Sequence, residues 1–288
     1  MLKRTITGVI MAGILFLILW LTSFSHFIFD GVVMVVGGIA AWELTRALSN
    51  PEGEKKFSVI LPAVIVAWLA SYPLAFFFGY MGLLFAVLIA AITAFIIFIF
   101  TPAIRIEDFF ATVFSILYPV GLLSVLFVIN NEYGMIPVIL AIAIGTISDL
   151  FAYFIGALFG KKKIFPKISP KKTYAGCIAG LVGGAIGGII VYLIFELGGF
   201  PTYVRFSFLK FFDGSVGATI GTYAAVGFVI AVFSEIGDLA ASRVKREVGI
   251  KDYGKLLGSH GGILDRIDSI LFTSVCMAII MEVIAQFL

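Results

Sequence analysis

Long runs of apolar residues recur along the whole chain, and they constrain its fold more than any other feature. They lie at about residues 5–23, 27–47, 58–78, 83–101, 109–129, 135–159, 175–196, 215–242 and 263–287. A bilayer core is about 30 Å thick, and only helices or closed barrels satisfy their backbone groups inside it, so runs of about 20 residues predict spanning helices. We therefore predict an all-α, polytopic integral membrane protein with about nine transmembrane helices.

The composition excludes a water-soluble globule. Of 288 residues, 61% are hydrophobic and 13% are charged, against roughly 25% charged in an average soluble protein. The mean hydropathy of +1.14 shows that apolar residues are spread throughout. We expect the lipid bilayer to surround most of the chain, and we expect no nucleic-acid partner.

The basic residues predict the orientation of the chain. If the N-terminus is cytoplasmic, 18 of the 20 lysines and arginines lie at the inner face, and only Arg205 and Lys210 lie outside. This asymmetry fits the positive-inside rule. It predicts a multi-pass protein of the cytoplasmic (inner) membrane, with its N-terminus inside and its C-terminus outside. Because ionisable residues accumulate late in the sequence, we expect residues 1–134 to be a helical scaffold and residues 135–288 to carry the site.

A polar stripe runs along the eighth predicted helix and continues at the start of the ninth. Helical spacing places the side chains of the eighth helix on one face: Glu235, Asp238, Ser242, Lys245 and Arg246. Asp265 and Asp268 are likewise three residues apart. Carboxylates inside a membrane helix mark a functional site by default, and Mg²⁺ prefers such oxygen ligands together with phosphates. We expect Asp238, Asp265 and Asp268 to hold one or two Mg²⁺ ions. Salt bridges of Asp238 with Arg266, or of Asp268 with Arg246, are the structural alternative.

Two further segments are typical of phosphate binding. Gly261 and Gly262 follow His260, and backbone without Cβ atoms can approach a phosphate closely at a helix start. The segment 169–173 reads Ser-Pro-Lys-Lys-Thr and leads directly into the seventh helix. The neighbouring lysines 161–163 are better explained by the positive-inside rule, which sets the orientation of the chain, and by binding to anionic lipid headgroups.

Glycines in the seventh helix predict close helix packing. Gly180, Gly183, Gly184, Gly187 and Gly188 follow small-xxx-small spacing. Such spacing lets helices approach closely, either within the fold or across a homodimer.

In these motifs the chain resembles the bacterial phosphatidate cytidylyltransferases, also called CDP-diacylglycerol synthases. The resemblance covers about residues 145–270. It rests on the segments Ser148-Asp149, Ser169-Pro170-Lys171-Lys172-Thr173, Ser242, Lys245-Arg246, Lys251-Asp252, His260-Gly261-Gly262 and Asp265-Arg266-Ile267-Asp268.

The resemblance implies a Mg²⁺-dependent enzyme that converts CTP and phosphatidic acid to CDP-diacylglycerol and pyrophosphate. It implies catalytic roles for Asp238, Asp265, Asp268, Lys245 and Arg246. It implies binding of substrate phosphates by Ser169, Lys171, Lys172, Thr173, Ser242, Lys251, His260, Gly261, Gly262 and Arg266.

Three other functions compete with this interpretation. A CTP-dependent polyprenol kinase is similar in its C-terminal helices but would transfer the γ-phosphoryl group and release CDP. A CDP-alcohol phosphotransferase would need Asp-Gly ahead of Ala-Arg, whereas Asp213-Gly214 is followed by Ser215-Val216. A transporter typically carries inverted repeats with polar groups near the midplane, and the sequence shows neither.

Overall fold

The structure, a computed structural model, describes residues 13, 16–49, 57–258 and 261–287. Its elements are helices apart from one two-stranded sheet. Seven of the described helices are long and apolar enough to cross a membrane. The predicted class, an all-α polytopic membrane protein, is confirmed. The count of nine spans stays a prediction, because most of the first run, 5–23, lies outside the described residues.

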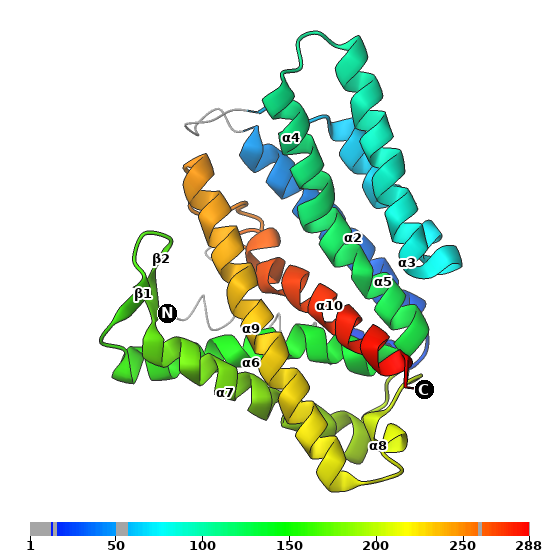
Figure 1. The fold of residues 1–288 in the computed structure, drawn as a ribbon, viewed down its shortest axis with the longest axis vertical. Helices are drawn as coiled ribbons and strands as arrows, with labels where there is room; N and C mark the ends of the chain where they lie inside the picture. Colours follow the sequence, from blue (N-terminus) through cyan, green and yellow to red (C-terminus); the bar gives the residue numbers. More distant parts are fainter. Residues whose placement is uncertain (1–12, 14–15, 50–56, 259–260, 288) are drawn as a thin grey trace. The chain divides into compact units, whose positions relative to one another are not determined.

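Contacts group the chain into two compact units, which we describe in turn. The first comprises Met1–Leu19, Phe27–Asn131 and Val244–Ile267, and the second comprises Trp20–His26, Glu132–Arg243 and Asp268–Leu288. In the first unit the helices are α2 (Phe27–Leu48), α3 (Leu61–Phe100), α4 (Ile106–Ser115) and α5 (Leu122–Tyr133) (Figure 1). A π-helix, η1 (Ile116–Gly121), joins α4 to α5 and contains Pro119. Because proline lacks a backbone donor, a wider turn there keeps the apolar helix continuous.

Helix α3 is interrupted at Gly79, where φ is 57° and ψ is −136°. A straight helix of 40 residues would be about 60 Å long, twice the bilayer core. Instead the backbone carbonyl of Leu74 lies against Gly82, so the chain reverses and segments 61–78 and 80–100 run side by side (Figure 1). The two spans predicted at 58–78 and 83–101 correspond to these halves. Glycine adopts this positive φ with little strain.

Trp68 joins the first half of α3 to its neighbours. Its indole Nε1 donates to the carbonyl of Met34 on α2 at 3.0 Å, and its ring lies over Gly37, where a Cβ atom would collide with it. The ring centroid of Phe127 on α5 is 5.9 Å away. One side chain therefore packs against two other helices of this unit.

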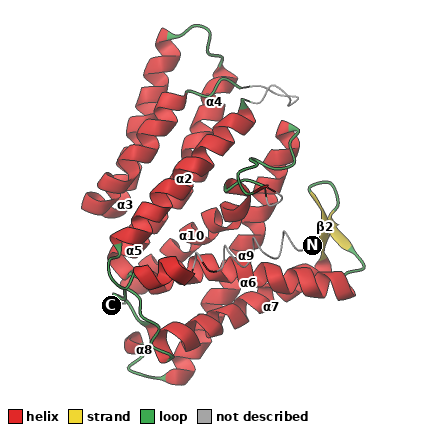
Figure 2. Cartoon of the chain, turned by 180° about the vertical axis from the view of Figure 1, so that it is seen from behind, coloured by secondary structure: helices red, strands yellow, loops and turns green. Residues whose placement is uncertain are grey.

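The second unit begins with a helical hairpin that carries the basic loop. Helix α6 (Met135–Phe159) and helix α7 (Tyr174–Val191) lie side by side (Figures 1 and 2). The segment between them was predicted as a loop, but it forms an antiparallel pair of strands, β1 (Lys163–Phe165) and β2 (Ser169–Thr173). Thr173 ends β2 and caps α7, because its hydroxyl accepts the N–H of Gly176 at 3.1 Å.

The glycine stripe of α7 packs within the fold. Cβ atoms at Gly183 and Gly187 would press on Phe151 and Ile147 of α6. Gly188 lies against the backbone carbonyl of Tyr223 on α9 (Val216–Val248). The predicted close approach of helices is thus confirmed, and it joins α7 to α6 on one side and to α9 on the other.

Helix α9 extends beyond its apolar run. The run ends near residue 242, but the helix continues to Val248, so Lys245 and Arg246 lie on it, as the helical spacing predicts. These residues are good helix formers. The helix ends at Gly249, whose φ is 77°, and the N–H of Ile250 donates to the carbonyl of Lys245 at 2.9 Å, as in a Schellman motif. Lys245 and Arg246 are therefore held on the last helical turn.

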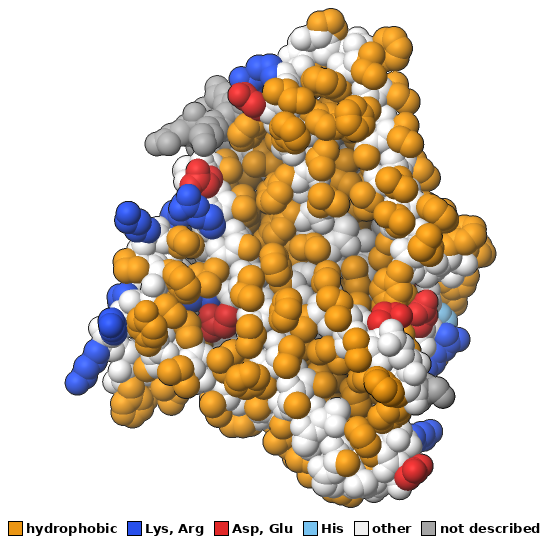
Figure 3. All heavy atoms as spheres, viewed as in Figure 1, with side chains coloured by type: hydrophobic (Ala, Val, Ile, Leu, Met, Phe, Trp, Pro, Cys, Tyr) orange, Lys and Arg blue, Asp and Glu red, His pale blue; other side chains and the backbone are white. Residues whose placement is uncertain are grey.

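The remaining elements are a π-helix, η2 (Tyr192–Leu197), a short helix, α8 (Phe208–Phe211), and the last helix, α10 (Leu264–Ala285). Within the second unit, α10 meets α6, because Thr273 donates to the carbonyl of Ala141 at 2.6 Å. Figure 3 shows apolar side chains over most of the visible face, with lysines and arginines at its margins. Many large apolar side chains are exposed, Phe77 and Phe100 at 73% and 80% among them, as expected of a surface that faces lipid.

Candidate active site

In the second unit, Lys172 lies between two carboxylates of α9. Its Nζ is 2.5 Å from Oε2 of Glu235 and 2.8 Å from Oδ2 of Asp238. Strand β2 carries the lysine, and the two acidic residues are one helical turn apart on α9. We call these three residues the Lys172 cluster. Segments more than 60 residues apart in the sequence thus meet in one charged group.

Buried polar side chains lie beside the Lys172 cluster. Gly180 of α7 leaves room there, since a Cβ atom at this position would lie 3.0 Å from both Oε1 of Glu235 and Oγ of Ser148. Ser148 is fully buried, and its hydroxyl has no hydrogen-bond partner among the described residues. The thiol of Cys177 lies 3.7 Å from Oε2 of Glu235. Ser148, singled out from the sequence, therefore lies beside the Lys172 cluster.

The carboxylates around Lys172 keep this lysine protonated. Burial alone would lower the pKa of this lysine, but the negative charges of Asp238 and Glu235 outweigh burial and hold the pKa above its usual range. The lysine is therefore cationic at neutral pH. Because two carboxylates already bind this lysine, it could bind a phosphate only by exchanging one of them for a phosphate oxygen.

In the first unit, Asp265 forms the second charged group. Its Oδ1 is 2.8 Å from Nζ of Lys245, and its Oδ2 accepts the backbone N–H groups of Tyr253 at 2.8 Å and Gly262 at 2.9 Å. The Asp265 side chain is 4% exposed. We call Lys245, Tyr253, Gly262 and Asp265 the Asp265 cluster. It ties the end of α9, the loop 249–263 and the start of α10 together.

The structure places the other predicted residues as follows. Lys171 is exposed beside Lys172, and Ser169 lies at the start of β2. Thr173 is buried and caps α7, so its hydroxyl already has a partner.

The remaining predicted residues lie on α9, on α10 or in the loop between them. Ser242 and Arg246 lie on α9, and Arg266 and Asp268 lie in the first turns of α10. Lys251 is exposed in the loop between these helices. Gly261 is buried with a φ of 80°. His260 lies outside the described residues.

Asp238, Asp265 and Asp268 differ in how they could serve a cation. Lys172 contacts only Oδ2 of Asp238, whose side chain is 31% exposed, so this carboxylate fits a metal ligand. Both oxygens of Asp265 are already bound to Lys245 and backbone donors. Asp268 is buried, and its Oδ1 accepts the N–H of Ser269 at 2.9 Å. Among the described residues, no three His, Cys, Asp or Glu side chains form a group that could hold a metal.

Glu43, on α2, was missed by the sequence analysis. It is buried in the first unit, and its carboxylate accepts the N–H of Ile263 at 3.1 Å and of Leu264 at 2.8 Å. The sequence does contain a signal for Glu43, because it is an acidic residue inside an apolar run. Ionisable residues inside membrane helices mark functional sites, and this rule, which singled out Asp238, applies equally to Glu43. Glu235 was placed on the polar stripe but was given no role at the site.

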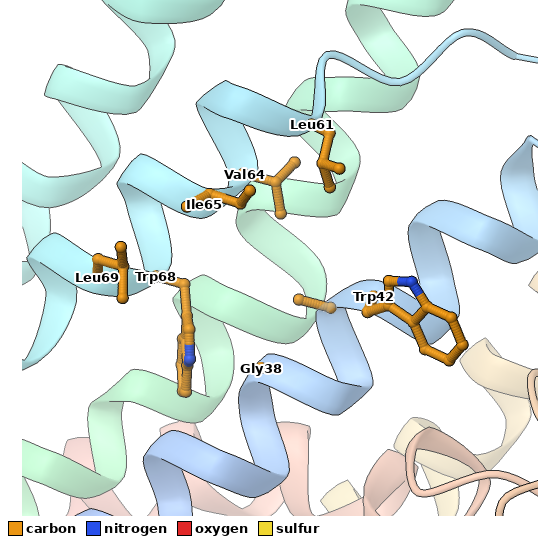
Figure 4. Close-up of a pocket in the computed structure, with 8 residues that line it drawn as sticks. Gly38, Trp42, Leu61, Val64, Ile65, Trp68 and Leu69 are labelled. Carbon is orange, nitrogen blue, oxygen red and sulfur yellow. The ribbon is translucent and has the colours of Figure 1, made fainter.

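An apolar groove between α2 and the first half of α3 is a separate feature of the first unit (Figure 4). Trp42, Leu61, Ile65 and Trp68 contribute to its lining, and none of the lining residues is charged. No charged side chain lines this groove, so we do not assign phosphate binding to it.

Helices that can cross a membrane, together with two lysine–carboxylate clusters, define an integral membrane protein whose charged groups suit phosphate chemistry. Comparison with known proteins makes this more specific. The profile of the cytidylyltransferase family matches residues 2–284. The chain belongs to this family.

Curated relatives extend over nearly the whole chain. The phosphatidate cytidylyltransferase of Helicobacter pylori strain J99 is 31% identical over 283 residues, which is 97% of this chain and 91% of that protein. The phosphatidate cytidylyltransferase of Aquifex aeolicus is 30% identical over 241 residues, or 83% of this chain and 77% of the relative. The one of Bacillus subtilis is 29% identical, with 94% of each chain covered.

Proposed function

We propose that this protein transfers the cytidylyl group of CTP to phosphatidic acid, forming CDP-diacylglycerol and pyrophosphate. The observation that carries the proposal is the match of residues 2–284 to the cytidylyltransferase family, together with similar phosphatidate cytidylyltransferases over most of the chain. A phosphate oxygen of phosphatidic acid attacks the α-phosphorus of CTP, and the bond to the β-phosphate oxygen breaks as pyrophosphate leaves. An enzyme catalyses such a transfer mainly by positioning the two substrates and by neutralising the negative charge of their phosphates.

Lysines supply the charge neutralisation in this proposal. Lys172 and Lys245 are held by carboxylates in their respective clusters, and both would exchange these partners for phosphate oxygens when substrates bind. Lys171, Arg246, Lys251 and Arg266 add positive charge, because a triphosphate and a phosphomonoester together carry more negative charge than two lysines can offset. Ser169 and Ser242 would donate hydrogen bonds to the same phosphates, and Gly261 and Gly262, which lack Cβ atoms, would let a phosphate approach the backbone closely.

We also propose that the reaction depends on Mg²⁺. Asp238 is the best-suited ligand, and Asp265 and Asp268 are the further ligands that the sequence predicts. Mg²⁺ bound there would offset phosphate charge and hold the phosphates in place. Asp265, in the first unit, could bind a metal ion through Oδ1 only if Lys245 leaves that oxygen, which is consistent with an exchange of Lys245 onto phosphate.

The site is proposed to work at the inner face of the cytoplasmic membrane, where a soluble nucleotide and a lipid phosphate can meet. Support comes from the membrane-spanning helices and from the concentration of lysine and arginine in the loops that are predicted to be cytoplasmic. Residues 135–288 would carry the reacting groups, and a homodimer would be compatible with this arrangement.

A product assay tests the proposal. The purified protein, reconstituted in phosphatidylcholine vesicles that contain phosphatidic acid, should release pyrophosphate from CTP and form CDP-diacylglycerol, identified by mass spectrometry. Omission of phosphatidic acid or addition of EDTA should abolish release. Release of CDP with a phosphorylated polyprenol as acceptor product would instead establish a lipid kinase and refute the proposal.

A further inference from the structure

The first turn of α10 has backbone donors that its own sequence cannot satisfy. The carbonyl of Ile263 accepts the N–H of Ile267 at 3.2 Å, so Ile263 is the N-cap residue. The first N–H groups of a helix have no partner within it and usually rely on a polar side chain at the N-cap. Isoleucine cannot provide one. The donors of Ile263 and Leu264 therefore need an acceptor from elsewhere.

Glu43 is that acceptor, and it comes from a helix 220 residues earlier in the sequence. Its Oε1 accepts the N–H of Ile263, and its Oε2 accepts the N–H of Leu264. Glu43 is 1% exposed, and Leu264 is fully buried. A carboxylate at a helix N-terminus also interacts favourably with the helix dipole. Among the described residues Glu43 has no ion pair, and these two N–H groups are the hydrogen-bond donors to its carboxylate.

Two glycines make room for this carboxylate. A Cβ atom at Gly254 would collide with Oε1 of Glu43, and a Cβ atom at Gly262 would collide with both carboxylate oxygens. The Glu43 carboxylate is thus enclosed by the loop that precedes α10. Because Gly262 also donates its N–H to Asp265, the same short segment contacts both Glu43 and Asp265.

We propose that Glu43 is a positioning residue for the reaction, which holds the Gly262 turn and Asp265 in place through the first turn of α10. This inference rests on the proposed function, since Asp265 belongs to the site only if that function is correct. Glu43 lies in the part of the chain that the sequence indicates as scaffold. Its effect on the reaction would be transmitted through backbone hydrogen bonds and involves no contact with substrate.

The test compares Glu43→Gln with Asp30→Asn. Asp30 is a second buried carboxylate of α2, and its Oδ1 accepts a hydrogen bond from Nδ2 of Asn130 on α5 at 2.9 Å, whereas Glu43 accepts from the start of α10. In Glu43→Gln one acceptor oxygen becomes a donor that faces a backbone N–H. We expect amide exchange of the segment 261–267 to rise about ten- to a hundredfold, kcat to fall by a similar factor, and KM for CTP to stay within about twofold. Asp30→Asn should leave exchange in this segment unchanged.

Gly254→Ala provides a second variant, which leaves Glu43 intact but pushes its carboxylate away. It should reproduce the kcat loss in the wild-type background. In a Glu43→Ala background the same change should have a much smaller effect, because the two substitutions disrupt one interaction.

Three results would overturn the proposal. They are wild-type exchange at 261–267 in Glu43→Gln, raised exchange there with unchanged kcat, or a loss of activity matched by raised exchange throughout α2 and α10. If the wild-type protein forms no CDP-diacylglycerol, the proposed function fails, and the exchange experiment still decides whether Glu43 anchors α10.

Discussion

Lysines and aspartates that the sequence assigns to different partners contact each other in both clusters. Lys172 was expected to bind phosphate and Asp238 to bind metal, and the two are paired. Lys245 and Asp265 repeat this arrangement. In the proposed function, each lysine would exchange its carboxylate for a phosphate oxygen, and the carboxylate would then be free to bind a metal ion. The pairs hold the side chains in place.

Removal of Lys172 should destabilise the protein. Lys172→Met leaves Glu235 and Asp238 without their cation, and loss of one partner from a buried ion pair costs as much as about 3 kcal/mol. Lys171→Met is the matched control, because Lys171 is exposed and should change stability by less than about 0.5 kcal/mol. Thermal unfolding of the two variants in one detergent measures the difference. Equal unfolding temperatures would show that the Lys172 cluster contributes no stability.

Substitution of Asp265 by asparagine should abolish turnover without preventing expression. The three contacts of the carboxylate, to Lys245, Tyr253 and Gly262, depend on its charge, and each contributes about 1.5–3 kcal/mol. We expect kcat to fall at least about a hundredfold. Asp213→Asn, at an exposed loop position, should retain activity. Near wild-type activity of Asp265→Asn at saturating Mg²⁺ would remove Asp265 from the site.

The residue types of the site could be predicted from the sequence, but the pairing of the residues could not. Helical spacing places Glu235 and Asp238 on one face, yet it does not show that Lys172, on a strand of another segment, reaches that face. Likewise, Arg266 was the alternative partner considered for Asp238, whereas the structure pairs Asp238 with Lys172 at 2.8 Å. Such pairings are set by tertiary packing.

At the scale of elements, glycines determine how closely α7 approaches α9. Gly188→Ala should destabilise the protein by about 1–3 kcal/mol, because its Cβ atom would collide with the carbonyl of Tyr223. Gly221→Ala on α9 has open space around it and should be neutral or stabilise the helix by up to about 1 kcal/mol. Unfolding temperatures of the purified variants measure both effects. An unchanged temperature for Gly188→Ala would argue against this packing.

Most helices could be predicted because each needs about 20 apolar residues, and the run 27–47 corresponds to α2 (Phe27–Leu48). Two features escaped prediction from hydropathy. The strands β1 and β2 are short and rich in lysine, so they show no alternating apolar pattern. The last turns of α9 are polar, so hydropathy could not separate them from a loop, although Gly249 marks where the helix ends.

At the scale of the whole molecule, topology determines whether both charged segments face the same compartment. Two candidate spans, Tyr174–Leu197 and Val216–Val248, separate residue 169 from residue 259. In a background that lacks Cys177 and Cys276, Ser169→Cys and Ser259→Cys should therefore react with a membrane-impermeant thiol reagent from the cytoplasmic side only. CTP should protect both positions.

Lys210→Cys is the control for this labelling, because one candidate span separates residue 210 from residue 169. It should react from the opposite side. Labelling of positions 169 and 259 from opposite faces would refute the predicted orientation and the shared use of the two segments.

The internal pairing of Lys172 and Lys245 with carboxylates also bears on how the protein is made. A charged side chain within the bilayer is costly unless it is paired with an opposite charge. Here each of these two lysines has its counter-charge in the same chain. We expect the polypeptide to reach its mature form during biogenesis without help from nucleotide or metal. Nucleotide and metal would then be needed for the activity of the protein but not for its assembly.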